Sequence, residues 1–378
     1  MLGATLSQIA LGAARPSASY AGLALGADAA VIGLIAASFA VLPMLVALPI
    51  GAVAGRIARI GVVPAASSAL LVAGCALGAL ATSIPLLLLA CAVIGVANLG
   101  LLIGAQAWIA RSAPVVRYND GFGWMTAGMA LGQAIGPLLS GWSIGLSASE
   151  QDGIAQSFWI AAGVGAVIVV VFASGAIRRD DDEPDARVGA TEILGTPDVA
   201  RYIVVSAAVL TSVDILIAYL PLLGAENGVA PVIVGTMLAV RGIASMLSRL
   251  LLGPLVRRFG QSALIVASAI GAAVCLAVVV SAPVPAVMFP ALAVGGFLLG
   301  MGQPLTMSAV AVALPASARS SGLALRLLGN RIAQTATPLL AGGVSVAFGA
   351  RSALLLQVVG LVASGAWEYA VRRGRENP

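Results

Sequence analysis

Long apolar runs restrict the fold of this chain more than any other feature of its sequence. Residues 158–176 and 263–280 each consist of apolar and small side chains alone. Each run has nearly the length, about 20 residues, that carries an α-helix across the hydrocarbon core of a bilayer. Only 9% of the residues are charged and 60% are hydrophobic, so too few polar side chains remain to cover a surface in water. We therefore predict an all-α membrane protein.

Polar and charged residues divide the chain into twelve predicted transmembrane helices. A charged segment with two prolines follows the sixth of them. We therefore predict two six-helix bundles, at 1–177 and 201–378, joined by a cytoplasmic central loop at 178–200. The predicted spans cover residues 3–24, 31–54, 65–82, 86–110, 118–142, 154–177, 202–223, 232–255, 262–280, 286–312, 321–345 and 352–370.

The two predicted bundles share an internal repeat. Residues 132–141 read GQAIGPLLSG and residues 333–342 read AQTATPLLAG, with Gln, Pro, two Leu and a final Gly at an offset of 201 residues. The end of span two, GAVAGRIARIG, is likewise matched by the end of span eight, GPLVRRFG. Both copies run in the same sense. A parallel duplication of this kind is found in transporters whose halves rock about a central site.

Arginine side chains predict the orientation of the helices, because the chain contains no lysine. Loops after even-numbered spans, with the C-terminal tail, hold fourteen arginines, whereas loops after odd-numbered spans hold only Arg351. Basic residues are enriched on the cytoplasmic side of membrane proteins. We therefore expect a multi-pass protein of the inner (cytoplasmic) membrane with both termini in the cytoplasm. The formal charge of +5 then reflects topology and predicts no binding of nucleic acid.

The residue types exclude several classes of function. Histidine is absent, which removes His-based triads, metal sites and proton relays. The cysteines Cys75, Cys91 and Cys275 stand singly in apolar segments without the spacing of metal ligands. No Gly-x-x-x-x-Gly-Lys-Ser/Thr loop is present to bind ATP. We therefore expect no enzyme, metal or cofactor. Composition alone allows a channel or a sensor, but the duplication favours a carrier.

The loops and the duplication resemble the major facilitator superfamily of secondary transporters. The resemblance rests on the Gly-Arg loops after spans two and eight, the Gly-x-x-x-Gly-Pro-x-x-x-Gly run in span five and the charged loop between the halves. It covers essentially the whole chain and implies cytoplasmic gate loops at Arg56, Arg59, Arg257 and Arg258. The family usually carries an Asp in this loop, where this chain has Gly55 and Arg257. The resemblance therefore does not imply the charge latch that involves that Asp.

The run in span five is expected to shape helix packing. Gly128, Gly132, Gly136 and Gly141 offer small positions for the close approach of a neighbouring helix, and Pro137 can bend the span. In the superfamily such a run is associated with exporters, particularly antiporters, so the resemblance favours export. The alternative is a role in packing alone.

Ionisable side chains deep in a bilayer are costly and usually functional, which singles out Asp214 and Arg241. From the rise per residue of a helix, Asp214 lies about 20 Å and Arg241 about 24 Å from the predicted cytoplasmic surface, on successive spans. We predict that they pair, and that Asp214, the only central carboxylate, carries a proton whose binding changes as the arginine moves. The alternative is a static pair that fixes spans seven and eight together.

Further polar side chains are predicted to bind the substrate, on spans that line the cavity in the superfamily. Arg15 and Arg331 belong to opposite halves, and each offers a planar guanidinium that suits a carboxylate or phosphate. The alternative is that each caps backbone carbonyls, as Arg15 would beside Pro16. Arg249 and Arg326 lie closer to the cytoplasm, where structural roles are expected. The predicted substrate-binding residues are Arg15, Asn98, Gln133, Gln303, Asn330, Arg331 and Gln334.

These features predict a monomeric secondary transporter that works by alternating access in lipid, with a small solute and protons as its partners. We expect proton-coupled export of a small organic solute and favour an anion, because arginines outnumber acids in the core. The alternative is a proton antiporter that expels apolar or cationic drugs. Such sites generally use a buried acid, and the only central acid here has an arginine near its level.

Overall fold

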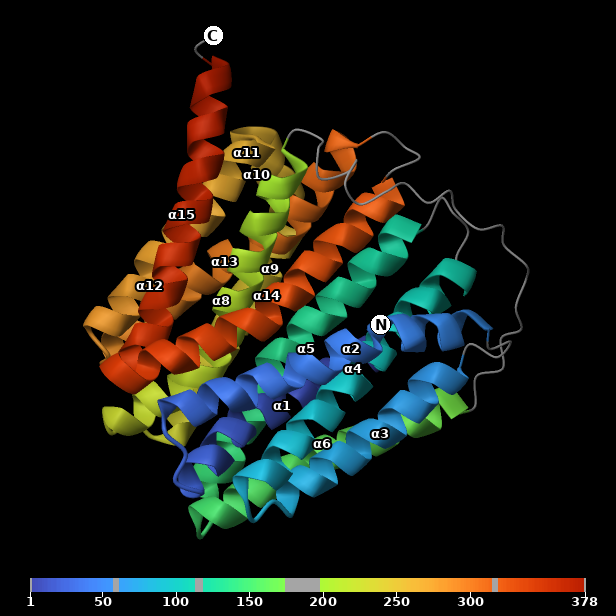
Figure 1. The fold of residues 1–378 in the computed structure, drawn as a ribbon, viewed down its shortest axis with the longest axis vertical. Helices are drawn as coiled ribbons and strands as arrows, with labels where there is room; N and C mark the ends of the chain where they lie inside the picture. Colours follow the sequence, from blue (N-terminus) through green and yellow to red (C-terminus); the bar gives the residue numbers. More distant parts are fainter. Residues whose placement is uncertain (1, 57–60, 113–117, 174–197, 315–318, 377–378) are drawn as a thin grey trace. The chain divides into compact units, whose positions relative to one another are not determined.

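The computed structural model describes residues 2–56, 61–112, 118–173, 198–314 and 319–376. The described chain is almost entirely helical (Figure 1). The helices are α1 (Leu2–Ala24), α2 (Ala29–Arg56), α3 (Val62–Ala79), α4 (Ile84–Ser112), α5 (Tyr118–Leu146), α6 (Glu150–Ala173), α8 (Val199–Glu226), α9 (Pro231–Leu250), α10 (Leu252–Phe259), α11 (Gln261–Val266), the π-helical turn η2 (Ala267–Gly271), α12 (Ala272–Ser281), α13 (Pro285–Ala313), α14 (Arg319–Phe348) and α15 (Ala350–Glu376).

All twelve predicted spans are found as helices, which confirms the predicted fold class. In the described ranges, nine candidate spans are long and apolar enough to cross a membrane. The long helices that do not meet this measure are α1, α5 and α14. These three helices carry five of the seven predicted substrate-binding residues. Their lower hydropathy therefore reflects polar side chains that are expected to face the interior of the protein.

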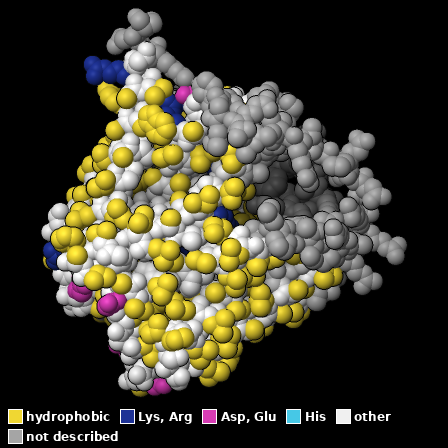
Figure 2. All heavy atoms as spheres, viewed as in Figure 1, with side chains coloured by type: hydrophobic (Ala, Val, Ile, Leu, Met, Phe, Trp, Pro, Cys, Tyr) yellow, Lys and Arg dark blue, Asp and Glu magenta, His cyan; other side chains and the backbone are white. Residues whose placement is uncertain are grey.

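The surface of the described helices is suited to lipid. Hydrophobic side chains are spread over the whole described surface visible in Figure 2, among backbone and other side chains, and charged side chains are sparse on that face. Large apolar side chains such as Val170, Val312 and Leu340 are more than half exposed. Exposed apolar groups of this kind are unfavourable in water and favourable against acyl chains.

Two predicted spans differ from simple helices. Span eight is predicted to reach residue 255, but α9 ends at Leu250 and the short helix α10 follows. Pro254 explains the break, because it has no N–H to donate to the carbonyl of Leu250. Span nine continues through the π-helical turn η2. This turn packs closely against α15 at Gly365, because a Cβ added to Gly365 would lie 2.7 Å from the side chain of Ile270.

Contacts divide the chain into two units. The first unit comprises Met1–Asp181 and Ile217–Gly242, and the second comprises Asp182–Leu216 and Ile243–Pro378. In the first unit α1 packs against α5, α6 and α4, and α3 packs against both α4 and α6. In the second unit α15 packs against α12 and α14. The division runs through α8 and α9, and the predicted domain boundaries at 177 and 201 stay a prediction.

The duplication is visible in the way α1 and α8 end. Gly26 and Gly228, 202 residues apart, both adopt a left-handed backbone with φ of 79° and 67°. In each case the amide of the next residue donates to a carbonyl five residues back, at Gly22 and Gly224, over 2.8 Å. This backbone pattern is a Schellman-type termination that favours glycine. Equivalent helices of the repeat therefore end in the same local structure.

The glycines of span five allow a neighbouring helix to approach α5 closely, as the sequence predicts, and the structure identifies α1 as that helix. A Cβ added to Gly136 would lie 2.6 Å from the carbonyl oxygen of Ile9 and 2.7 Å from the Cα of Gly12. A Cβ at Gly132 would also meet the backbone of α1, and one at Gly141 would meet the backbone of α9 within the same unit. Because backbone atoms cannot yield as a side chain can, these positions require glycine.

Gly136→Ala is expected to lower the free energy of unfolding by about 1–3 kcal/mol, because the added methyl group forces α1 and α5 apart. Thermal unfolding of the purified protein in detergent measures the change. The matched control is Gly163→Ala on α6, where an added Cβ meets no atom within 4 Å. The control is expected to unfold at the same temperature or slightly higher. Equal destabilisation by both substitutions would contradict the packing argument.

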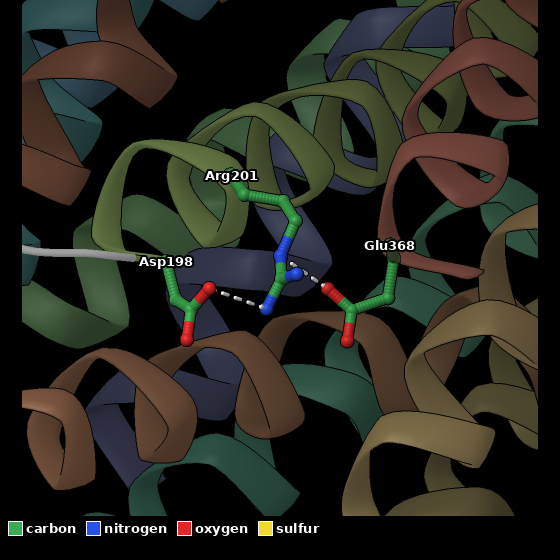
Figure 3. Close-up of polar contacts among 3 residues, drawn as sticks. All are labelled: Asp198, Arg201 and Glu368. Carbon is green, nitrogen blue, oxygen red and sulfur yellow. Dashed lines mark ion pairs between the residues drawn. The ribbon is translucent and has the colours of Figure 1, made fainter. Parts of the chain in front are cut away.

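A buried ion pair joins the start of α8 to α15 (Figure 3). The Nε of Arg201 lies 2.7 Å from Oε2 of Glu368, and its Nη2 lies 3.1 Å from Oδ1 of Asp198. The side chains of Arg201 and Glu368 are only 4% and 1% exposed. A buried charge that loses its partner is strongly unfavourable. This pair therefore fixes α8 against α15 within the second unit.

Glu368→Gln is expected to destabilise the protein by about 3–5 kcal/mol, because it leaves the buried guanidinium without its closest countercharge. Asp198→Asn is the matched control, since it makes the same chemical change at the more exposed partner. Asn also tolerates the left-handed backbone of Asp198, whose φ is 78°. The control is expected to cost about 1 kcal/mol or less. Thermal unfolding that ranks the two variants in the opposite order would be evidence against this account.

Candidate functional site

Polar side chains meet inside each unit, on helices that correspond in the repeat. In the first unit they come from α1, α4 and α5, and in the second from α8, α13 and α14. These are the first, fourth and fifth long helices of each half of the duplication. The repeat therefore produces two polar clusters of similar construction.

The cluster in the first unit is uncharged. Gln133 of α5 donates through Nε2 to Oε1 of Gln8 over 3.3 Å, and Gln8 donates to Oδ1 of Asn98 over 3.3 Å. A cavity of about 10 Å³ lies against Gln8 and Asn98 and is otherwise lined largely by apolar side chains, including Met125 and Met129. Its volume is about the space of one water molecule. The structure thus brings the predicted Asn98 and Gln133 together through Gln8, which the sequence analysis missed.

In the second unit an amide joins a carboxylate to a guanidinium. Gln334 donates through Nε2 to Oδ2 of Asp214 over 2.7 Å, and its Oε1 accepts from Nη1 of Arg331 over 3.0 Å. Gln334 is 8% exposed, whereas Asp214 and Arg331 are half-buried. Gln133 and Gln334 occupy the same position of the repeat. Each donates to a side chain on the first helix of its copy. The acceptor is the neutral amide of Gln8 in the first unit and the carboxylate of Asp214 in the second.

A second group of polar side chains in this unit is centred on Arg326. We call it the Arg326 cluster, and its members are Ser206, Gln303, Arg326 and Asn330. Nη1 of Arg326 donates to Oγ of Ser206 over 2.6 Å and to Oε1 of Gln303 over 2.9 Å. Ser206 donates to Oδ1 of Asn330 over 3.0 Å, and Nε2 of Gln303 donates to the backbone carbonyl of Ser206 over 2.7 Å. Arg326 is 5% exposed, and Ser206 and Asn330 are buried.

The Arg326 cluster combines predicted and unpredicted residues. Gln303 and Asn330 are among the predicted substrate-binding residues, and they meet here. Arg326 was expected to be structural because of its place near the cytoplasmic end of its span. Ser206 gave no signal, since serine is frequent in membrane helices. The spacing of Arg326, Asn330 and Gln334 at every fourth residue places them on one helix face, which the sequence alone could have indicated.

The remaining predicted binding and coupling residues lie in the first unit. The guanidinium of Arg15 lies 5.5 Å from the ring centroid of Phe39, within the range of a cation–π contact, and α1 continues through Pro16. Arg241 is 1% exposed on α9. Asp214 belongs to the second unit, so its predicted pairing with Arg241 stays a prediction.

The predicted gate loops are described only in part. Arg59 lies outside the described residues, and Arg56 is the last residue of α2. Arg257 and Arg258 are exposed on α10, and the guanidinium of Arg258 lies 5.4 Å from the ring centroid of Phe259. Arg249 donates through Nε to the carbonyl of Gly300 over 3.3 Å, a contact that suits the structural role expected for it.

Comparison with known proteins identifies the family. The sequence matches the profile described as Major Facilitator Superfamily over residues 1–222 and again over 202–377. The chain belongs to this superfamily. No match was found among curated protein sequences.

Solved transporter structures share the fold. One is a bacterial homologue of the human lysosomal transporter Spinster, inward-facing and unoccupied, with 17% identity over 98% of this chain and 95% of that chain and a TM-score of 0.78. Another is a variant of the nucleoside transporter NupG, with 15% identity, 98% of both chains covered and a TM-score of 0.79. A third is a D-xylose–proton symporter, with 14% identity, 97% and 96% coverage and a TM-score of 0.77. At these identities the likeness is one of fold.

Membership of the superfamily defines the general activity. The protein is a multi-pass membrane transporter of the kind that moves small solutes, rather than an enzyme. The two matches to the family profile together cover residues 1–377. The hydrogen-bonded clusters on α1, α4 and α5 and on α8, α13 and α14 are the candidate functional sites.

Proposed function

We propose that this major facilitator exports a small organic anion together with a proton, by alternating access in the inner membrane. Asp214 carries the proton, and the arginines of the core attract the anion. The observation that carries the proposal is the chain of hydrogen bonds from Arg331 through Gln334 to Asp214. In this chain of hydrogen bonds the carboxylate of Asp214, which can gain a proton, is separated from the permanent positive charge of Arg331 by the amide of Gln334 alone.

The sign of the coupling follows from charge. While Asp214 is ionised, its carboxylate offsets the field of the nearby Arg331. Protonation removes the negative charge and leaves a net positive site, which attracts an anion more strongly. By reciprocity, a bound anion must favour binding of the proton by the same factor. A proton and an anion that bind together also add no net charge, which lowers the cost of carrying them through a low-dielectric region.

The amide of Gln334 supplies a mechanism for this coupling. It now donates to Asp214 and accepts from Arg331. A protonated Asp214 can itself donate, and the amide then rotates so that Oε1 accepts from the acid. Nε2 of Gln334 would then face the guanidinium of Arg331. Because both groups are donors, no hydrogen bond can form between them. Arg331 is thereby released from Gln334 and becomes available to a solute.

The outward direction is supported by the run in span five, which resembles that of exporters in the superfamily. A metabolic acid that accumulates in the cell would leave with its proton down its own gradient. The alternative is a proton antiporter for cationic drugs, in which the ionised Asp214 would bind the drug and a proton would compete with it. The two functions require opposite effects of pH on solute affinity.

Wild-type protein is expected to bind the anion more tightly as pH falls, by up to about tenfold per pH unit for one coupled proton. Asp214→Asn mimics the protonated acid, so it should retain counterflow of the anion in proteoliposomes and lose the dependence on pH. Asp28→Asn is the control, because Asp28 is exposed and caps α2 through the amide of Val31, which Asn can also do. Affinity that falls as pH falls would favour the drug antiporter.

Gln334→Leu is expected to reduce the number of protons moved per solute, because it removes the amide that connects Asp214 to Arg331. Gln133→Leu is the matched control at the same position of the other repeat, where the amide donates to the neutral Gln8. Proton flux recorded with a pH-sensitive dye, beside flux of the labelled solute, gives the ratio. A lowered ratio in Gln133→Leu but not in Gln334→Leu would count against the relay.

A further inference from the structure

We infer that the Arg326 cluster binds the carboxylate of the transported solute, and that Arg326 is its principal anchor. This inference rests on the proposed function, because it assigns the anion to one site. Among the described residues, both acceptors of Arg326 are neutral, the hydroxyl of Ser206 and the amide of Gln303. No carboxylate compensates the charge within this cluster, of which Ser206, Arg326 and Asn330 are buried.

The charge of Arg326 calls for an anion. Taking a guanidinium out of water is strongly unfavourable unless an opposite charge or several hydrogen bonds replace the lost hydration. In the described part of the chain, the buried Nε of Arg326 has no hydrogen-bond partner. Nη1 already donates twice, so Nε is the donor that a further acceptor would engage. A carboxylate is planar and fits the edge of a guanidinium with charge-assisted hydrogen bonds.

The repeat provides an internal comparison that separates packing from chemistry. At the offset of 201 residues, Arg326 corresponds to Met125 and Asn330 corresponds to Met129. At the offset of 202 shown by the ends of α1 and α8, Ser206 corresponds to Ala4. The three counterparts, Ala4, Met125 and Met129, line one cavity in the first unit. The three counterpart side chains are thus apolar in one copy, whereas in the other copy they are polar and one of them is charged.

Packing therefore does not require arginine at this place. Met125 is an unbranched side chain that fills the position in the first unit without any charge. The second unit instead holds Arg326 among oriented hydrogen-bonding groups of three helices. A single positive charge in a neutral setting matches one carboxylate, whereas a doubly charged phosphate would leave charge uncompensated. The chemistry of the cluster thus favours a small carboxylic acid.

The cluster is also placed to communicate with the proton site. Arg326, Asn330 and Gln334 follow one another at intervals of four residues along α14, and so share one face of that helix. Gln334 bonds to Asp214, while Asn330 and Arg326 bond to Ser206. Both acceptors, Asp214 and Ser206, are on α8. The carboxylate site and the proton site are therefore built from the same pair of helices.

The experiment uses the full-length protein in detergent and a panel of small monocarboxylic acids, each beside its neutral amide. Thermal stabilisation and calorimetric titration report binding. Wild-type protein is expected to be stabilised by at least one acid and not by its amide. Arg326→Met, which installs the residue of the other repeat, should weaken binding of that acid at least about tenfold while the protein stays folded. Arg351→Met, at an exposed arginine, is the control for loss of charge.

A second variant keeps the test decisive if Arg326→Met folds poorly. Gln303→Glu puts a carboxylate where the amide oxygen already accepts from Arg326 over 2.9 Å. It should raise the unfolding temperature, because the buried charge gains a permanent partner, and it should abolish binding of the acid. If Arg326 had only a structural role, Gln303→Glu would raise the unfolding temperature without affecting the binding of the acid.

The outcomes separate this site from the proposed function. Loss of acid binding in Arg326→Met, with pH-independent binding in Asp214→Asn, supports both. Loss of acid binding in Arg326→Met together with unaltered pH dependence in Asp214→Asn supports the site and removes the proton role of Asp214. The inference is overturned if no acid stabilises the wild type more than its amide does, or if folded Arg326→Met binds the acid within about twofold of the wild type.

Discussion

A charge buried in a membrane protein must be compensated, and this requirement organises the polar interior of the chain. The described residues meet it in several ways. Arg201 is compensated by two carboxylates, whereas Arg15 lies over an aromatic ring. Arg331 donates to the amide oxygen of Gln334, whose amide nitrogen donates to Asp214. Arg326 is held by the hydroxyl of Ser206 and the amide oxygen of Gln303, which are both neutral. The ion pairs of Arg201 are suited to stability. The neutral acceptors of Arg326 leave its charge uncompensated, so a negatively charged solute could compensate it.

The duplication explains how such different chemistry can arise on one scaffold. Both copies retain the glutamine of the fifth helix, Gln133 or Gln334, and both direct its amide to the first helix of the copy. The backbone turns that end α1 and α8 are also the same. Only the second copy carries ionisable groups at the connected positions. The helical framework is thus common to both halves, and the proposed binding of proton and anion is a property of one.

The sequence predicted the helices well, because apolar runs and their interruptions are local signals. It also predicted that a helix packs closely at the glycines of α5, since small residues allow close helix approach, but it did not indicate that this helix is α1. The side-chain contacts were harder to predict. Depth along the membrane normal suggested Arg241 as the partner of Asp214, and this pairing stays a prediction. Depth contains no information on the direction in which a side chain points. The bond from Gln334 depends on that direction, as does the placing of Arg326 between Ser206 and Gln303.

The shared use of α8 and α14 bears on how coupling and movement are related. The proposed proton site and the proposed carboxylate site each join these two helices, through Gln334 to Asp214 in one case and through Arg326 to Ser206 in the other. In the proposed function, a change of protonation therefore alters anion binding through groups that all lie within the second unit. The proposed coupling therefore depends on the local charges carried by α8 and α14.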